Sequence, residues 1–211
     1  MTEIDKQLSD LKQIRQLMER SSKFISLSGL SGISAGLIAL IAAFIARWRI
    51  MSVLDQSNVV SYRAIPNFDT LYTLMYELIA LGAITFVLAV AVAYFFTNRK
   101  AREEGQSLFD AISLRLLLNL AIPIVTGGLF CLVLLQQNIS LVAPATLIFY
   151  GLGLVNASKY TVDHIRYLGI AEIALGLIAC AFPSKGLYFW AIGFGIFHIV
   201  YGAVMYFKLE R

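Results

Sequence analysis

Charged side chains are scarce in this sequence. Only 14% of its 211 residues are Asp, Glu, Lys or Arg, whereas soluble domains carry about 25%. Hydrophobic residues make up 59% of the chain. This balance excludes a soluble fold with a generous charged surface and favours a chain that exposes apolar side chains to lipid.

Cysteine and histidine are also rare, with two residues of each. Cys131 and Cys180 stand alone inside apolar runs, which is typical of packing residues rather than of a disulfide or metal pair. His198 lies deep in its run and His164 near the edge of another, so a bis-histidine haem site is not expected. The sequence predicts no cofactor and no metal.

The motifs that carry enzyme chemistry are missing as well. The chain has no HExxH, GxSxG, CxxC or Walker sequence. Its Gly-x-Gly pairs at 151 and 193 lie inside apolar runs and follow no strand, which excludes dinucleotide binding. The sequence therefore leans away from an enzyme.

Long apolar runs are what the chain does contain. Each is about as long as a helix that crosses a bilayer, roughly 20 residues. They predict an all-α, polytopic integral membrane protein with six transmembrane helices arranged as three antiparallel hairpins. We expect a transmembrane domain over 26–211, preceded by an amphipathic helix over 1–25. The six runs are 26–46, 71–96, 112–135, 140–157, 165–182 and 187–207.

The net charge of +4 is better explained by orientation than by nucleic acid. With the N-terminus in the cytoplasm, 13 of the 17 basic residues fall on the inner side, as the positive-inside rule expects. The sequence predicts an inner (cell) membrane location with both termini cytoplasmic, the lipid bilayer as partner and no nucleic acid. The four outer residues are Arg47, Arg49, Arg63 and Lys185.

The stretch before the first span reads as an amphipathic helix. Ile4, Leu11, Met18 and Ile25 recur every seven residues and form one apolar face. Such a helix can lie on the inner membrane surface or against the spans. The alternative is a coiled-coil or partner-docking arm, although Arg15 would fall on its seam.

The first span is rich in small residues. Ser28, Gly32 and Gly36 repeat at four-residue spacing, and small-xxx-small faces let helices approach closely in lipid. Packing within the chain is one reading of this face, and a homo-oligomer contact is the other.

Two short segments recur along the chain. Residues 29–39 (GLSGISAGLIA) align with 169–179 (GIAEIALGLIA), and 151–156 (GLGLVN) align with 193–198 (GFGIFH). Both aligned pairs are expected to cross the membrane in the same direction, which indicates a repeat of the parallel type.

The last two spans carry a family resemblance. Their sequence, YLGIAEIALGLIACAFPSKGLYFWAIGFGIFHIVYGAVMYFK, has spaced glycines at 169, 176, 193 and 202 and a turn at Pro183. It resembles the hairpin repeat of the HdeD-type acid-resistance membrane proteins, which are small six-span bacterial proteins. The segments RSSKFISLSGLSG and FWAIGFGIFHIVYG also look like those of small bacterial polytopic membrane proteins of unassigned function. The resemblance implies membrane-associated stress tolerance.

Glu172 and His198 are the strongest candidate site. Ser184 lies in the turn between their runs, and Glu172 stands 12 positions before it and His198 14 after. At 1.5 Å per helical residue both would lie about 20 Å below the turn. Such a pair carries one proton in either of its neutral or zwitterionic forms and titrates as a unit. It could hold a proton or ligand, or form an interhelical hydrogen bond of about 0.6–2 kcal/mol.

Three further polar residues stand inside predicted spans. Glu77 either reaches the outer interface or lines an outer vestibule, and we include it in the proton or ligand site hypothesis. Asn119 and Asn156 are candidates for bonds between helices, with Pro123 expected to kink its span.

The favoured function is that of a non-enzymatic integral membrane protein with a structural, stress-related or partner-binding role. The alternative is a small proton-linked transporter or channel that uses Glu172 and His198. A membrane-embedded enzyme acting on lipid is the third hypothesis, and the missing motifs place it last.

Overall fold

The computed structural model describes residues 28–56, 68–103, 111–162 and 164–210. Within these ranges every regular element is a helix, so the predicted all-α class is confirmed. The amphipathic helix expected over 1–25 lies outside the described residues.

Within the described ranges six helical stretches are long and apolar enough to cross a membrane, which agrees with the predicted number. The first three and the fifth are single α-helices, and the fourth and sixth include short 3-10 or π segments. The elements are α2 (Gly29–Gln56), α3 (Phe68–Glu103), α4 (Ala111–Gln137), η2 (Ile139–Leu141), α5 (Val142–Ala157), η3 (Ser158–Tyr160), α6 (His164–Ala181), η4 (Pro183–Lys185), α7 (Gly186–Trp190), η5 (Ala191–Phe197), α8 (His198–Met205) and η6 (Tyr206–Glu210).

The first two helices extend beyond the predicted apolar runs of 26–46 and 71–96. Helix α2 continues through Gln56, and α3 already begins at Phe68. Charge does not end α2 here because Arg49 is paired with Glu77 of α3. The counter-charge on α3 lets α2 stay helical beyond its apolar run of 26–46.

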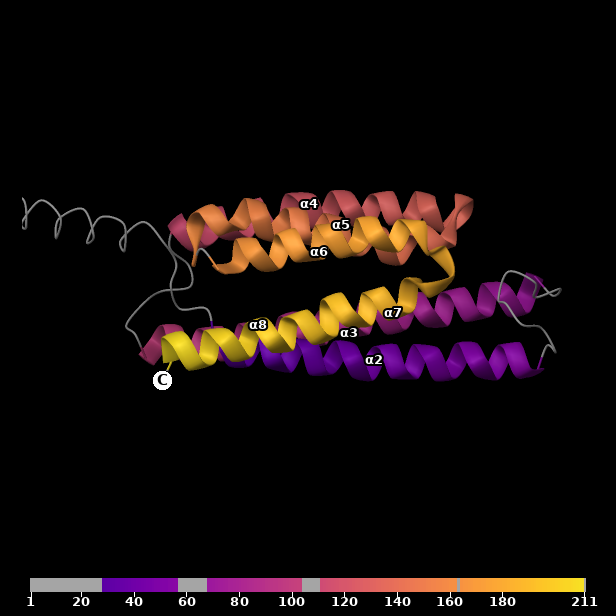
Figure 1. Cartoon of the computed structure of the whole chain (residues 1–211), viewed down its shortest axis with the longest axis horizontal. Coiled ribbons are helices and arrows are strands. Elements are labelled where there is room, and N and C mark those ends of the chain that lie inside the picture. Colours follow the sequence, from indigo (N-terminus) through magenta and orange to yellow (C-terminus); the bar gives the residue numbers. More distant parts are fainter. Residues whose placement is uncertain (1–27, 57–67, 104–110, 163, 211) are drawn as a thin grey trace, which may run out of the picture.

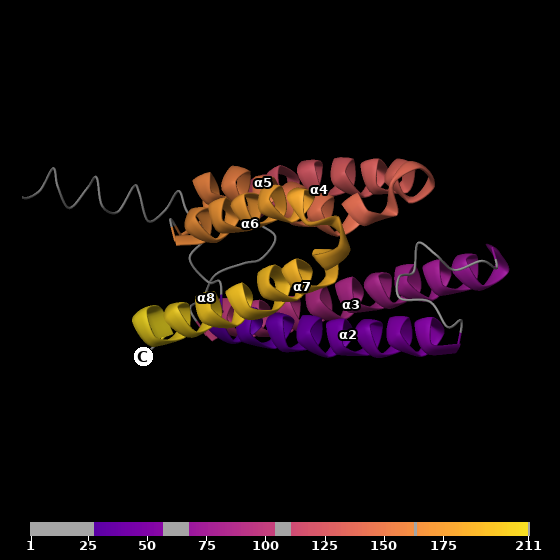
Figure 2. The ribbon, with the colours of Figure 1, turned by 45° about the vertical axis from the view of Figure 1, so that its right-hand side comes forward.

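The helices form two units of three, seen in both ribbon views (Figures 1 and 2). The α4–α6 unit contains α4, α5 and α6. The α2–α8 unit contains α2, α3 and the continuous rod made of α7, η5 and α8. The η4 turn carries the chain from the first unit to the second. As a result α6 packs chiefly against α5, and α8 packs against α2.

Helices α3 and α4 expose most of their apolar surface. Only Leu74, Thr85 and Ala101 are buried along the 36 residues of α3. On α4, Ile122 and Leu129 are each 62% exposed. Apolar surface on this scale fits contact with lipid rather than with water.

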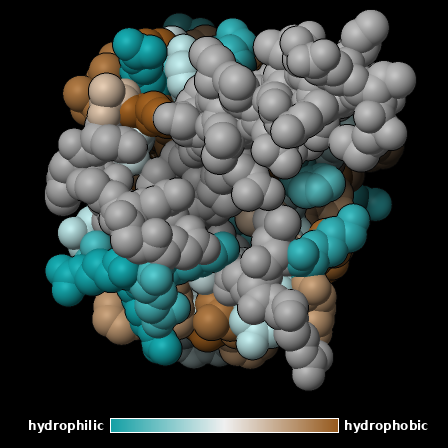
Figure 3. Space-filling view, turned by 90° about the vertical axis from the view of Figure 1, so that its left-hand side faces the viewer, coloured by the Kyte–Doolittle hydropathy of each residue, from teal (hydrophilic) through white to brown (hydrophobic). Residues whose placement is uncertain are grey.

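The two ends of the molecule differ in their connections. The tail end, at the left of Figure 1, holds the C-terminus, and the turn end holds the η4 turn. Figure 3 shows the tail end face-on, with hydrophilic side chains among apolar ones. These two names are used below for the positions of side chains along the helices.

Candidate functional site: a buried acid and imidazole between the two units

Glycines set the packing of α2 on η5 and α8. A Cβ at Gly36 would lie 2.6 Å from the Gly195 carbonyl oxygen and 3.0 Å from the Ile199 nitrogen. A Cβ at Gly32 would lie 3.1 Å from the Gly202 Cα atom. The helix backbones therefore touch, as small-residue faces permit in lipid. In the predicted face of Ser28, Gly32 and Gly36, the two glycines thus pack against η5 and α8 of the same chain.

Helices α6 and α5 touch through the same kind of contact. A Cβ at Gly176 would lie 3.0 Å from the Pro144 carbonyl oxygen and 3.1 Å from the Ile148 nitrogen. A Cβ at Gly151 would lie 2.5 Å from the Gly169 carbonyl oxygen. Each unit therefore contains at least one helix pair in backbone contact.

These two helix pairs correspond residue by residue. Gly36 meets Ile199 as Gly176 meets Ile148, and Gly202 meets Ile33 as Gly151 meets Ile173. The contacts agree with the sequence alignment of 29–39 with 169–179.

The contacts contradict the second alignment, of 151–156 with 193–198. In these contacts Gly151 of α5 corresponds to Gly202 of α8, because each of the two meets the backbone of its own partner helix. Gly193, which the alignment matched to Gly151, meets side chains instead. Closely spaced glycines in this stretch of the chain allowed a plausible but wrong register.

One eight-residue pattern recurs on all four of these helices. It begins with Gly or Pro, has Ile at its fifth position and ends with Gly. Its fourth position lies on the same side of the helix as its first and last, because positions three and four apart share a face. The four copies are 29–36, 144–151, 169–176 and 195–202, and their fourth residues are Gly32, Leu147, Glu172 and His198.

Glu172 projects from α6 into the junction between the two units. Its side chain is fully buried, and a Cβ at Gly193 of η5 would collide with Glu172 Oε2 and with Leu147. Any larger residue at 193 would therefore force the Glu172 and Leu147 side chains to move. Glu172 Oε1 lies 3.5 Å from His198 Nδ1. Neither carboxyl oxygen has a hydrogen-bond partner among the described residues.

The imidazole of His198, by contrast, has a partner at each nitrogen. Nδ1 lies 3.1 Å from the Gly193 carbonyl oxygen, and Nε2 lies 2.7 Å from the Tyr150 hydroxyl of α5. A carbonyl can only accept, so Nδ1 carries a proton and donates it to Gly193. In the neutral ring, Nε2 then accepts the hydrogen of Tyr150. Phe194 stacks on the same ring, with centroids 6.0 Å apart.

The backbone before His198 is unusual. Residues 191–197 form a π-helix, η5, that includes both Gly193 and Phe194. Single π turns inside α-helices are rare and frequently occur at functional sites. The π turn here lies directly against Glu172.

Tyr201 lacks a hydrogen-bond partner of the kind that Tyr150 has in His198, among the described residues. It occupies the same pattern position on α8 that Tyr150 occupies on α5. The residue equivalent to His198 on α5 is Leu147, which offers no polar atom. The Tyr201 hydroxyl is buried and has no hydrogen-bond partner among the described residues.

Glu77 is engaged elsewhere. Arg49 Nε donates to Glu77 Oε2 at 2.6 Å, and Arg49 Nη2 donates to Oε1 at 3.0 Å. This two-pronged contact ties α2 to α3 toward the turn end, where both groups are partly exposed. The structure gives Glu77 a cationic partner and does not join it to Glu172.

Asn119 and Asn156 do meet between helices, through one backbone group. Asn156 Nδ2 donates to the Asn119 carbonyl oxygen at 3.0 Å. That carbonyl would normally accept from the residue four positions on, which is Pro123 and has no N–H. The side chain on α5 therefore replaces the hydrogen bond that the proline removes from α4.

Sequence reasoning identified Glu172 and His198 but missed Tyr150 and Gly193. Tyr150 is one of ten tyrosines and has no unusual neighbours in the sequence. The signal available was the repeated pattern, which places Tyr150 one position before its closing glycine, as Tyr201 is on α8.

The chain matches no family model, curated protein or solved structure with which it was compared. Within the described ranges, no three His, Cys, Asp or Glu side chains gather as a metal site.

Proposed function

We propose that this is a non-enzymatic integral membrane protein that moves protons, or a solute coupled to protons, across the bilayer. The observation that carries the proposal is the Glu172 carboxyl group. It is fully buried, lies 3.5 Å from an imidazole and has no hydrogen-bond partner among the described residues.

A purely structural carboxyl group would be expected to have donors. Burying a carboxylate without a hydrogen bond is costly, and in lipid the cost is greater than in a soluble core. Glu172 therefore needs either a proton of its own or a new donor. Both are changes that a transport cycle supplies.

His198 is placed to be that donor. Its Nδ1–H points to the Gly193 carbonyl at 3.1 Å while Glu172 Oε1 lies 3.5 Å away. A small rotation of the ring would transfer the N–H from one acceptor to the other. The pair then holds one proton in either arrangement, and the two residues titrate together.

The junction between the units offers a way to reach this pair from water. Glu172 belongs to the α4–α6 unit, and His198 belongs to the α2–α8 unit. A shift of one unit against the other would change the environment of both residues at once. Rocking of packed helical units around a central site is a common basis of alternating access.

We place the protein in the cell membrane with the tail end toward the cytoplasm. Of the ten Lys and Arg residues in the described ranges, seven lie toward the tail end, as the positive-inside rule expects. In this arrangement consecutive spans alternate in direction. The seven are Arg99, Lys100, Arg102, Arg115, Lys159, Arg166 and Lys208.

A second candidate is a structural, stress-related or partner-binding role without transport. It is favoured by His198, whose two nitrogens are both used to join α5 to η5. In that case the pair would serve only to fix the two units together.

Proton flux in liposomes tests the first proposal. Wild-type protein should acidify or alkalinise the lumen under a proton gradient, and Glu172→Gln or His198→Ala should abolish the movement. Glu103→Gln is the matched control, because Glu103 is an exposed acid paired with Arg99 on its own helix. It should leave the flux unchanged.

The result distinguishes the two candidates. Wild-type flux no greater than that of empty vesicles would overturn proton transport. Coupling to a solute would then be tested by solute uptake with and without a gradient. A structural role predicts instead that Glu172→Gln changes the melting temperature in detergent while no variant changes any flux.

A further inference from the structure

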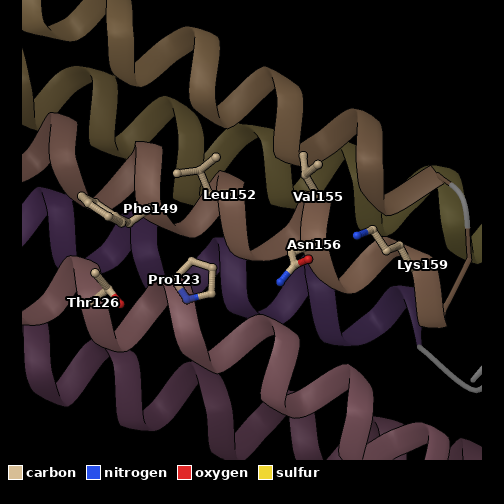
Figure 4. A pocket seen from close by; sticks show the side chains of 7 residues that line it. All are labelled: Pro123, Thr126, Phe149, Leu152, Val155, Asn156 and Lys159. Atoms are coloured by element: carbon tan, nitrogen blue, oxygen red, sulfur yellow. The ribbon is translucent and has the colours of Figure 1, made fainter.

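A groove lies between α4 and α5, away from Glu172. It has a volume of about 410 Å³ and opens to the surface of the protein, within the usual size of ligand-binding clefts. Its described lining is apolar for most of its length (Figure 4). The lining residues are Pro123, Thr126, Phe149, Leu152, Val155, Asn156 and Lys159.

The sequence explains why this α4–α5 groove exists. Phe149, Leu152 and Asn156 of α5 follow one stripe at helical spacing, and Lys159 of η3 continues it. The α4 side presents the compact residues Pro123 and Thr126. The Thr126 hydroxyl donates to the Ile122 carbonyl at 2.8 Å, so its polarity is satisfied within α4. Large side chains on one wall and compact ones on the other leave the space unfilled.

The polar groups of the groove are confined to its tail end. Apart from Thr126, the polar lining residues are Asn156 and Lys159. In Figure 4 the Lys159 side chain extends toward Asn156. Lys159 is exposed. Arg115 precedes Asn119 and Pro123 at four-residue steps on α4, so it belongs to the same stripe of that helix. Lys159 thus stands at the tail end of an apolar groove, and Arg115 lies on the α4 stripe that continues toward that end.

We propose that the α4–α5 groove holds an acyl chain of an anionic phospholipid whose headgroup phosphate binds Lys159. The apolar walls match a hydrocarbon chain, and the exposed neighbours of the groove on α4 place it at the lipid-facing surface. The Lys159 ammonium supplies the opposite charge at the depth where a headgroup would lie. Arg115 adds a second cation for the same phosphate.

This inference is independent of proton transport. It concerns a different surface of the protein and none of the groups near Glu172. A bound lipid would fill the groove and strengthen the contact between α4 and α5.

Native mass spectrometry of the full-length protein in detergent tests the lipid site. Phosphatidylglycerol and phosphatidylcholine with identical acyl chains are added in turn, and bound lipid is counted. The wild type should retain phosphatidylglycerol more strongly. Lys159→Gln should weaken that binding about fivefold, as expected for one basic residue near the headgroup. Lys185→Gln at the turn end is the control and should have no effect.

A second pair of variants separates the groove from surface charge. Leu152→Trp should fill the groove and reduce phosphatidylglycerol binding, whereas Leu129→Trp, at an exposed α4 position outside the lining, should not. Equal retention of the two lipids would overturn the proposal. So would an equal loss in Lys159→Gln and Lys185→Gln, or full binding by Leu152→Trp, because each indicates attraction to headgroups without the groove. Melting temperatures confirm that all variants are folded.

Discussion

Glu172 and His198 occupy the same position of a repeated helix pattern and face each other across the junction of two helical units, 3.5 Å apart. The repeat puts Gly32 and Leu147 at the corresponding positions of α2 and α5. The shared position therefore holds an acid on α6, a base on α8 and apolar residues on α2 and α5.

The first prediction concerns Gly193. Gly193→Ala would force a methyl group against Glu172 Oε2 and Leu147, and overpacking of this kind costs about 1–3 kcal/mol. Gly128→Ala is the control, because a Cβ there meets no described atom within 4 Å. It should be neutral or stabilising by up to about 1 kcal/mol, since alanine favours helix over glycine. Thermal unfolding in detergent measures both, and equal melting temperatures would contradict the close approach of Glu172 to η5.

The second prediction compares two equivalent tyrosines. Tyr150→Phe removes the hydroxyl that lies 2.7 Å from His198 Nε2, and interhelical hydrogen bonds in membranes contribute about 0.6–1.7 kcal/mol. Tyr201→Phe removes a buried hydroxyl that has no partner among the described residues, so it should be neutral or slightly stabilising. Reversible unfolding by titration with a denaturing detergent gives both free energies. The prediction fails if the Tyr201 variant loses as much stability as the Tyr150 variant.

The number of helices was predictable because lipid imposes a minimum length on every span. Six apolar runs gave six helices in the described part of the chain without any knowledge of tertiary packing. Helix ends were less predictable. Arg49 lies beyond the predicted apolar run of 26–46, yet it is helical because Glu77 on the next helix supplies its counter-charge. An ion pair between two helices leaves no local signal in either one.

The site was predictable only in part, for a similar reason. A buried acid and base can be recognised in an apolar sequence, because so few residues there are ionisable. Tyr150 and Gly193 cannot be recognised in this way, since tyrosine and glycine are common in this chain. Their roles follow from the crossing of α5 and α6 with η5, and that crossing depends on which glycines meet. The alignment of 151–156 with 193–198 was wrong because the sequence does not show which of the glycines contact the neighbouring helix.

The third prediction follows from the equivalence of the two helix pairs. Gly36 and Gly176 contact corresponding atoms of Ile199 and Ile148. Gly36→Ala and Gly176→Ala should therefore destabilise the protein by similar amounts, about 1–3 kcal/mol each. Because the substitutions lie in different units and share no partner, their effects in the double variant should add to within about 0.5 kcal/mol. A large effect at one glycine and none at the other would contradict the equivalence.

The fourth prediction concerns the carbonyl group that Pro123 leaves without a helical donor. Asn156→Leu removes the side chain that donates to the Asn119 carbonyl at 3.0 Å. A buried acceptor left unpaired costs about 1–3 kcal/mol, so the variant should be less stable by roughly that amount.

Pro123→Ala provides the internal control for this loss. Alanine restores a backbone N–H four residues after Asn119, and the carbonyl regains its helical partner. Asn156→Leu should then cost less in the Pro123→Ala background than in the wild type, and a double-mutant cycle of unfolding free energies measures the difference. If the two costs are equal, Asn156 does not replace the missing bond and its amide contributes to α5 packing in some other way. A positive coupling of about 1 kcal/mol or more assigns the asparagine to the defect that the proline creates.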